Sequence, residues 1–311
     1  MKKLISKASI GIAAGILLTI GVFVYLGLNF YMENKATKKI QEWMDRSGWI
    51  SELTYQSLHA GVFSKKIRIN RISLRIKGCD SPVAIDCITL YSSGITIGIP
   101  LDIHVEIQGF HIPPDHPMIN MTNITSVRFA QLGYAEMTGD LKCAFQYDPQ
   151  KKDLDIQQLS ISALDMGQLD ITASLKNLDL YAIRLIPDNL LMMLPLVSSV
   201  SISRISVNYQ DHSLVQRYLR QSALQSGQST EQLVSEIILR LDKEIQKQKY
   251  SAVRKILLAL QMIVKQSGSI EVTAFPYQPV SLIQVAMAAA DPEKITGLLN
   301  ISAHYREPVQ P

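Results

Sequence analysis

The sequence predicts an α+β protein in which an N-terminal transmembrane helix precedes a curved antiparallel β-sheet packed with a C-terminal helical segment. Residues 8–32 contain no charged side chain, and 25 such positions in a helix span about 37 Å, more than the roughly 30 Å of a bilayer core. Apolar residues then alternate with polar residues through much of 49–210. After Asp211 they recur at helical spacing instead, which predicts a change from strands to helices.

The apolar segment 8–32 is predicted to be a signal anchor that stays in the membrane. It is longer than the apolar core of a secretory signal peptide, although a cleaved peptide is the alternative. Lys2, Lys3 and Lys7 precede it, so residues 1–7 are expected in the cytoplasm and the body outside it. Trp43 and Trp49 suit either a membrane interface or the start of the domain core.

Residues 33–48 are predicted to form a helical stalk, and residues 49–210 an antiparallel β-rich domain. In one strand the apolar alternation of Ile67 and Ile69 resumes at Ile72, one position out of step around Asn70-Arg71, which predicts a β-bulge. Residues 148–153 and Asp165-Met166-Gly167 have the composition of hairpin turns.

The segment 211–268 is predicted to be helical and to pack on the sheet. Asp211 is the expected N-cap of its first helix, and Ser229 with Gln232 has the spacing of a capping box. Residues 269–306 are expected to return as strands at 270–274 and 298–303 around a short helix at 282–290, and residues 307–311 as a disordered tail. If the helices cover the sheet incompletely, an apolar channel remains.

Composition and motifs argue against several classes of activity. The net charge is only +4 and the basic residues are scattered, so no nucleic-acid partner is expected. The sequence contains no GxSxG, P-loop or GxGxxG motif, so neither hydrolase nor nucleotide chemistry is supported. We therefore predict no catalytic, cofactor-binding or metal-binding residues and no enzyme activity. An extracytoplasmic enzyme with an unrecognised site remains a third hypothesis.

The cysteine and histidine residues leave alternatives open. Cys79, Cys87 and Cys143 can include a disulfide, either Cys79–Cys87 or Cys87–Cys143 on neighbouring strands, or they can be three buried free thiols. His111 and His116 flank Asp115 in a proline-rich loop without the rigid spacing of a zinc motif, so a solvated loop is favoured over a metal site. Four other histidines complete the set: His59, His104, His212 and His304.

The layout resembles AsmA-like and YdgA-like periplasmic proteins of Gram-negative bacteria. The resemblance rests on the N-terminal anchor, on Tyr55 with Gly61-Val62-Phe63-Ser64 before an alternating strand, on the turn at 164–171, and on Tyr209-Gln210-Asp211 opening the helices. It implies a single-pass protein of the bacterial inner membrane with a cytoplasmic N-terminus and a periplasmic C-terminal domain. Some larger relatives are long β-grooves implicated in phospholipid transport or outer-membrane maintenance, but this chain is far shorter. The resemblance therefore bears on location and fold more than on activity, and it identifies no functional residues.

Two further hypotheses concern function without catalysis. In the first, the sheet holds or passes lipid acyl chains, or supports envelope biogenesis. In the second, the protein is a scaffold that docks another envelope protein through its helical segment or its sheet edge. Both place a membrane beside the chain, with a lipid or a protein of the envelope as the partner.

Overall fold

The computed structural model describes residues 33–38, 40–42, 50–61, 65–96, 99–116, 129–185, 195–196, 198–248 and 250–307. Within them the chain is α+β, with a large antiparallel sheet and C-terminal helices, as the sequence predicts. The predicted tail 1–7 and membrane segment 8–32 lie outside the described residues, as do Trp43, Trp49 and residues 308–311. None of the described helices is both long enough and apolar enough to cross a bilayer.

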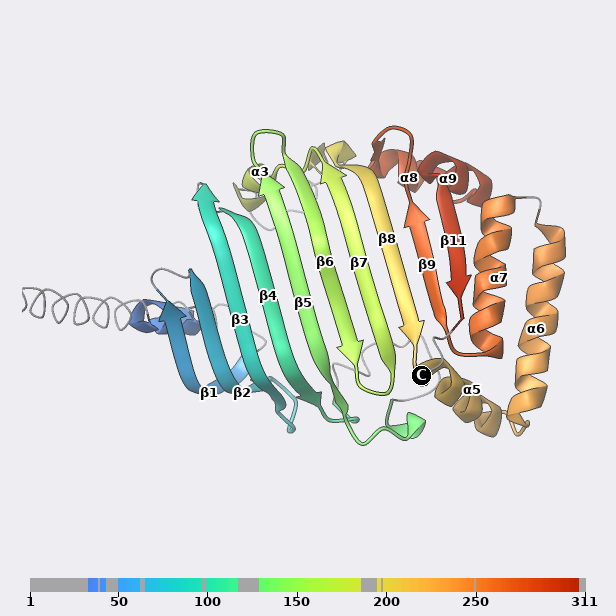
Figure 1. Cartoon of the computed structure of the whole chain (residues 1–311), viewed down its shortest axis with the longest axis horizontal. Helices are drawn as coiled ribbons and strands as arrows, with labels where there is room; N and C mark the ends of the chain where they lie inside the picture. Colours follow the sequence, from blue (N-terminus) through green and yellow to red (C-terminus); the bar gives the residue numbers. More distant parts are fainter. Residues whose placement is uncertain are drawn as a thin grey trace, which may run out of the picture.

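One sheet contains all the described strands, and Figure 1 shows it face on. Its order is β1 to β9 and then β11, so each strand from β1 to β8 pairs with its neighbours in the sequence. Strand β9 pairs with β8 and β11, and β10 adds to β8. Every pairing is antiparallel. The strands are β1 (Ile50–Gly61), β2 (Lys66–Ile76), β3 (Val83–Thr96), β4 (Ile99–Ile112), β5 (Met137–Asp148), β6 (Asp153–Ala163), β7 (Gly167–Lys176), β8 (Ser201–Asp211), β9 (Ser269–Ala274), β10 (Val280–Ser281) and β11 (Ile301–Arg306).

The main helices gather at the β11 end of the sheet, far from β1 (Figure 1). Residues 33–38 and 40–42 are helical, and they lie beside β1, where Tyr55 donates a hydrogen bond to Thr37. The remaining helical elements are η1 (Phe129–Leu132), α3 (Leu180–Leu185), α5 (Leu214–Gln225), α6 (Thr230–Lys247), α7 (Ser251–Lys265), α8 (Leu282–Ala288) and α9 (Pro292–Leu299).

The predicted turns and caps are present, with one shift of position. The side chain of Asp148 accepts the backbone N–H groups of Gln150 and Lys151, which tightens the β5–β6 turn. The Ser229 capping box is formed with Gln232. Asp211 is not the N-cap of α5, because Ser213 occupies that position. Asp211 ends β8 instead, buried, and still accepts the Val215 N–H at 3.0 Å, so it stabilises the helix start from two residues further back.

The predicted last strand begins too early. Residues 298–299 end α9, and β11 starts at Ile301. The helix was recognisable from its first turn, where Asp291 accepts the N–H groups of Glu293 and Lys294 and Pro292 follows the cap. The strand alternation therefore starts after Asn300, which closes α9 with a left-handed backbone at φ 47°.

The predicted offset at Asn70-Arg71 is present, but it is not a β-bulge, because the register of β2 with β1 and β3 is the same on both sides of it. At Asn70-Arg71 two consecutive residues point to the same face, and Arg71 has φ +50°. The same step occurs at matching register in β1 to β4, and we call the line of four steps the crease. Its residue pairs are Gln56–Ser57, Asn70–Arg71, Asp86–Cys87 and Gln108–Gly109. The crease ends at β5, where the register with β4 shifts.

Buried clusters lie around the C-terminal strands and at one end of β6 and β7. Ala259 and Ile263 of α7 pack against Ile270 of β9, with Val272 and Tyr305 beside them. A second cluster joins β8, β9 and β10 to α8 and α9, and a third surrounds Tyr134, Ala163 and Met166. The helices of the described chain thus cover β9 and β11, whereas their packing does not extend over the middle of the sheet.

Candidate functional site

Apolar side chains on one face of the sheet form rows that run across the strands. Cross-strand pairing links Leu159 of β6 to Ile171 of β7 and then to Val207 of β8. The same cross-strand pairing continues in both directions through the ten strands β1 to β9 and β11. We call this row of side chains the Ile171 row. Its members are Ala60, Ile67, Leu90, Val105, Cys143, Leu159, Ile171, Val207, Val272 and Ala303.

A second row lies directly beside the first, and we call it the Ile161 row. It crosses the same ten strands and contains no charged residue. Its members are Leu58, Ile69, Ile88, Ile107, Leu141, Ile161, Leu169, Tyr209, Ile270 and Tyr305. Together the two rows make an apolar band, and we call the side of the sheet that carries it the apolar face.

The apolar band is not fully buried. In the Ile171 row only the end residues Ala60 and Ala303 are buried, and the eight between them are half-buried. From β2 to β8 the band crosses six strand spacings, about 29 Å. Half-buried isoleucine, leucine and valine side chains over such a distance form a surface that gains free energy when an apolar ligand covers it.

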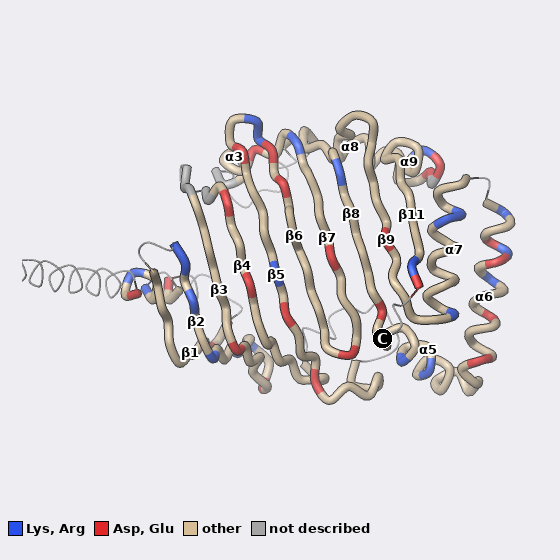
Figure 2. Tube along the Cα trace, in the orientation of Figure 1, with Lys and Arg blue, Asp and Glu red and all other residues tan. Residues whose placement is uncertain are grey.

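The opposite face is polar. Thr172 of β7 and Lys142 of β5 alternate with the apolar residues beside them in the chain. Charged residues occur singly along the strands in Figure 2, while α6 carries charges of both signs. The two faces therefore differ in the ligands they can accept, and the apolar face is the candidate surface for an apolar ligand.

The cysteines are free in the structure. Cys87 lies opposite Gln108 on the polar face, whereas Cys143 lies opposite Val105 in the Ile171 row. Strand β4 separates the two, so they are not on neighbouring strands and cannot pair. Cys79 lies in the turn after β2, whereas the residue of β2 that pairs with Cys87 is Asn70. Cys79 and Cys87 are therefore not opposite each other in the sheet. The three are not uniformly buried, because only Cys87 is. Burial raises the pKa of the Cys143 thiol, which favours its protonated, apolar form.

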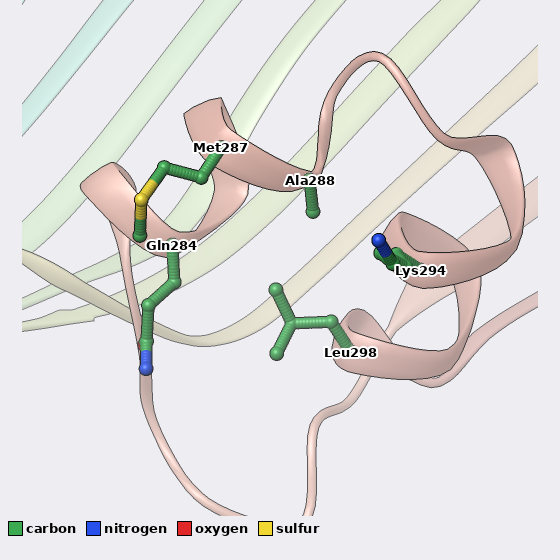
Figure 3. Close-up of a pocket in the computed structure, with 5 residues that line it drawn as sticks. All are labelled: Gln284, Met287, Ala288, Lys294 and Leu298. Carbon is green, nitrogen blue, oxygen red and sulfur yellow. The ribbon is translucent and has the colours of Figure 1, made fainter.

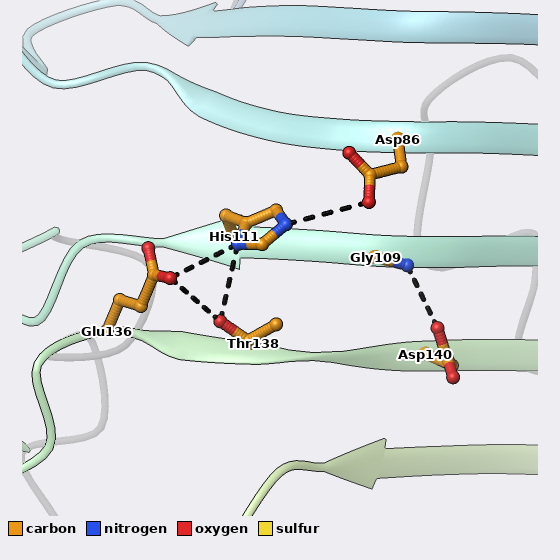
Figure 4. A network of polar contacts seen from close by, with 6 residues as sticks. All are labelled: Asp86, Gly109, His111, Glu136, Thr138 and Asp140. Carbon is orange, nitrogen blue, oxygen red and sulfur yellow. Dashed lines mark hydrogen bonds and ion pairs between the residues drawn. The ribbon is translucent and has the colours of Figure 1, made fainter.

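His111 belongs to strand β4 rather than to a loop, and it lies between two carboxylates (Figure 4). Its Nδ1 is 3.3 Å from Glu136 Oε1, and its Nε2 is 3.8 Å from Asp86 Oδ2. Thr138 also contacts His111 Nδ1, at 3.3 Å. Asp86 is 72% exposed and Glu136 49% exposed, so these groups form an open surface cluster and not the enclosed cleft that acid–base catalysis uses.

The expectation of a solvated loop is wrong for His116, which is 1% exposed. Its backbone N–H bonds to the carbonyl of Pro113, so the chain turns back on itself there. His111 and His116 do not converge with Asp115, and the described residues contain no group of three His, Cys, Asp or Glu side chains arranged to hold a metal.

The other histidines are dispersed. His59 is 3.5 Å from Glu33 and His104 is 3.0 Å from Asp102, both as surface pairs. The backbone of His212 bonds to the Met166 carbonyl, and His304 lies on β11 beside α7.

A small apolar hollow of about 500 Å³ lies between α8 and α9 (Figure 3). Met287, Ala288 and Leu298 line it, and Gln284 and Lys294 stand at its sides. It lies at the β11 end of the sheet, away from the half-buried middle of the apolar band.

Comparison with known proteins adds little chemistry. A family model described only as "Uncharacterized protein" matches residues 160–306, the part of the chain from β6 to β11. No curated protein matches the chain.

Proposed function

We propose that the apolar face binds the acyl chains of lipids, and that the protein acts without catalysis in lipid transport or envelope assembly. One observation carries this proposal: two adjacent rows of apolar side chains cross ten strands, and their middle is half-buried. Acyl chains have no polar group to satisfy, so a long apolar strip suits them better than it suits a small polar metabolite.

The length of the band favours an extended ligand. Because the rows run across the strands, a ligand lying along them contacts a new side chain about every 4.8 Å. Each half-buried aliphatic side chain that it covers contributes about 1 kcal/mol. Several such contacts together give useful affinity. Because the contacts are alike along the row, no single position holds the ligand more tightly than the others. That combination suits movement along the sheet as well as storage.

The expected source of the lipid is the membrane itself. Residues 8–32 are proposed to anchor the chain in the bacterial inner membrane, with the sheet in the periplasm, and β1 begins only 17 residues after this segment. The sheet would therefore start close to the bilayer and extend away from it. A tag at the C-terminus should be accessible from the periplasmic side of spheroplasts; access only from the cytosol would contradict this orientation.

Native mass spectrometry of the detergent-extracted protein tests lipid binding directly. We expect adducts with the masses of membrane phospholipids that survive removal of the detergent. Repeated preparations without any bound lipid, together with no uptake of lipid from added vesicles, would refute the acyl-chain proposal.

A scaffold role is the second candidate, because three leucines on α6 and α7 stay exposed. Leu239 is 60% exposed, Leu258 41% and Leu260 43%. Cross-linking in intact cells from these positions should yield a defined protein adduct if the helices dock a partner. Adducts in the absence of bound lipid would favour the scaffold over the lipid carrier.

A further inference from the structure

The polar side of the crease is hollowed into a depression of about 710 Å³. At the crease both side chains of the pair line the depression in β1, β2 and β3, and Gln108 adds one from β4, so polar groups are concentrated along this line. Strands β1 to β4 all contribute side chains to the depression, among them Gln56, Asn70 and Gln108. These groups offer hydrogen-bond donors and acceptors to a hydroxyl-bearing ligand.

Two arginines line the same depression, and they have different surroundings. Arg68 is held from within: its Nε donates to Asn70 Oδ1 and to Cys87 Sγ, each at 3.2 Å. Asn70 in turn donates to Ser57 Oγ at 2.9 Å, and Cys87 is buried. This network fixes the stem of Arg68 through Nε and leaves the end of its guanidinium directed away from those bonds.

Arg71 has a backbone that most side chains avoid, with φ +50°. A non-glycine residue in this region costs about 1 kcal/mol, and such strain is concentrated at functional positions. Asp86 stands opposite Arg71 in the register of β2 and β3, yet its carboxylate contacts His111 instead. Among the described residues, neither Arg71 nor Arg68 forms an ion pair with a carboxylate.

We propose that the depression on the polar side of the crease is a binding site for a phosphate ester, whose phosphate lies between Arg68 and Arg71. Two guanidinium groups match the charge of about −2 on a phosphate monoester, and their planar forks bind its oxygens in pairs. The amides of Gln56 and Gln108 can then donate hydrogen bonds to hydroxyls on the rest of the ligand and accept them, and the Asp86 carboxylate can accept them.

This site is independent of lipid binding on the apolar face. The crease side chains point to the polar face, so a single lipid cannot have its acyl chains in the Ile171 row and its phosphate in the crease. A water-soluble phosphate ester is therefore the expected ligand. Loss of one activity should leave the other intact.

Isothermal titration calorimetry of the full-length protein in detergent at low salt tests the proposal, with sn-glycerol 3-phosphate as the probe. The test variants are Arg71→Asn and Arg71→Gly, because both residues accept a left-handed backbone. The control is Arg75→Gln on the same strand and face, where Arg75 pairs with Glu52 outside the depression. We expect binding by the wild type and by the control, and affinity at least about tenfold lower for both Arg71 variants.

The two roles of Arg71 predict opposite outcomes in thermal unfolding. If Arg71 only supports the fold, its variants lose stability and binding together. If it is retained for the ligand, the variants melt at the same or a higher temperature while binding is lost. Equal affinity in wild type and Arg71 variants, or no binding by the wild type, overturns the site. Binding of phosphatidic acid micelles but not of glycerol 3-phosphate overturns the assignment to a soluble ester.

Discussion

Replacing Ile171 by glutamate places a charge in the middle of the apolar band and should block lipid binding. Ile171 is half-buried, and its neighbours across the strands are Leu159 and Val207. Losing the apolar contact costs about 1 kcal/mol, and bringing a carboxylate beneath an acyl chain costs about 1–2 kcal/mol more at a site that still reaches water. The sum of about 2–3 kcal/mol corresponds to an affinity about 30- to 150-fold lower.

The matched control is Thr172→Glu, one residue along the same strand and on the polar face. It introduces the same charge at the same depth in the sheet, and we expect lipid affinity to remain within about twofold of wild type. A milder variant, Ile171→Thr, keeps a β-branched side chain and should weaken binding only about fivefold.

The assay is titration with a fluorescent phospholipid whose emission rises in an apolar environment, and circular dichroism confirms that each variant is folded. Equal losses for the two glutamate variants would mean that the effect arises from damage to β7 and not from the apolar face. Unchanged binding by Ile171→Glu would refute the apolar face as the lipid site.

Three further predictions follow from the same structure. Lipid bound along the Ile171 row should slow the alkylation of Cys143 by a maleimide, without affecting Cys79 in the turn after β2. Peptide mass spectrometry measures both rates. Equal rates at Cys143 with and without lipid would count against the Ile171 row as the binding surface. Asp211→Ala removes a buried carboxylate that accepts hydrogen bonds from the Tyr209 hydroxyl and the Val215 N–H. We expect the free energy of unfolding to fall by about 3 kcal/mol and the melting temperature by about 6–12 °C. A change in melting temperature under about 2 °C would contradict that role. A hydrogen bond from Lys152 holds the pKa of Asp179 below its ordinary value of 3.8. This carboxylate therefore stabilises the fold above that pH, and the stabilisation disappears as pH falls through the lower folded-state pKa. The difference in melting temperature between wild type and Asp179→Asn should shrink in acid, and a difference that grows in acid would refute this role.

Much of the strand pattern was predictable because each strand has one apolar face. Alternation placed β5, β6 and β7 close to their observed limits, since the β5–β6 turn and the β6–β7 turn have recognisable turn residues. The offset at Asn70-Arg71 was visible in the sequence, but the bulge predicted from it is wrong, because the register of β2 with β1 and β3 does not change there. The continuation of this offset through β1, β3 and β4 was not predicted, because each step is ambiguous alone and only the pairing register aligns the four.

The placement of the helices was harder to predict. Amphipathic stripes indicate that a helix packs against something, but they do not say against which part of the sheet. The structure places α7 on β9 and β11 and leaves the middle of the band half-buried. Histidine environments were equally inaccessible, because the burial of His116 and the contacts of His111 with Asp86 and Glu136 depend on residues far away in the sequence.

The strand order has a consequence for how the molecule is made. From β1 to β8 every strand pairs with the one synthesised just before it, so each hairpin can join the growing sheet as the chain emerges. Strand β9 must wait, because 57 residues containing α5, α6 and α7 separate it from the end of β8. Nascent sheet therefore exposes the free edge of β8 until those helices are complete, and this interval is when an unfinished chain is most prone to pair with another copy.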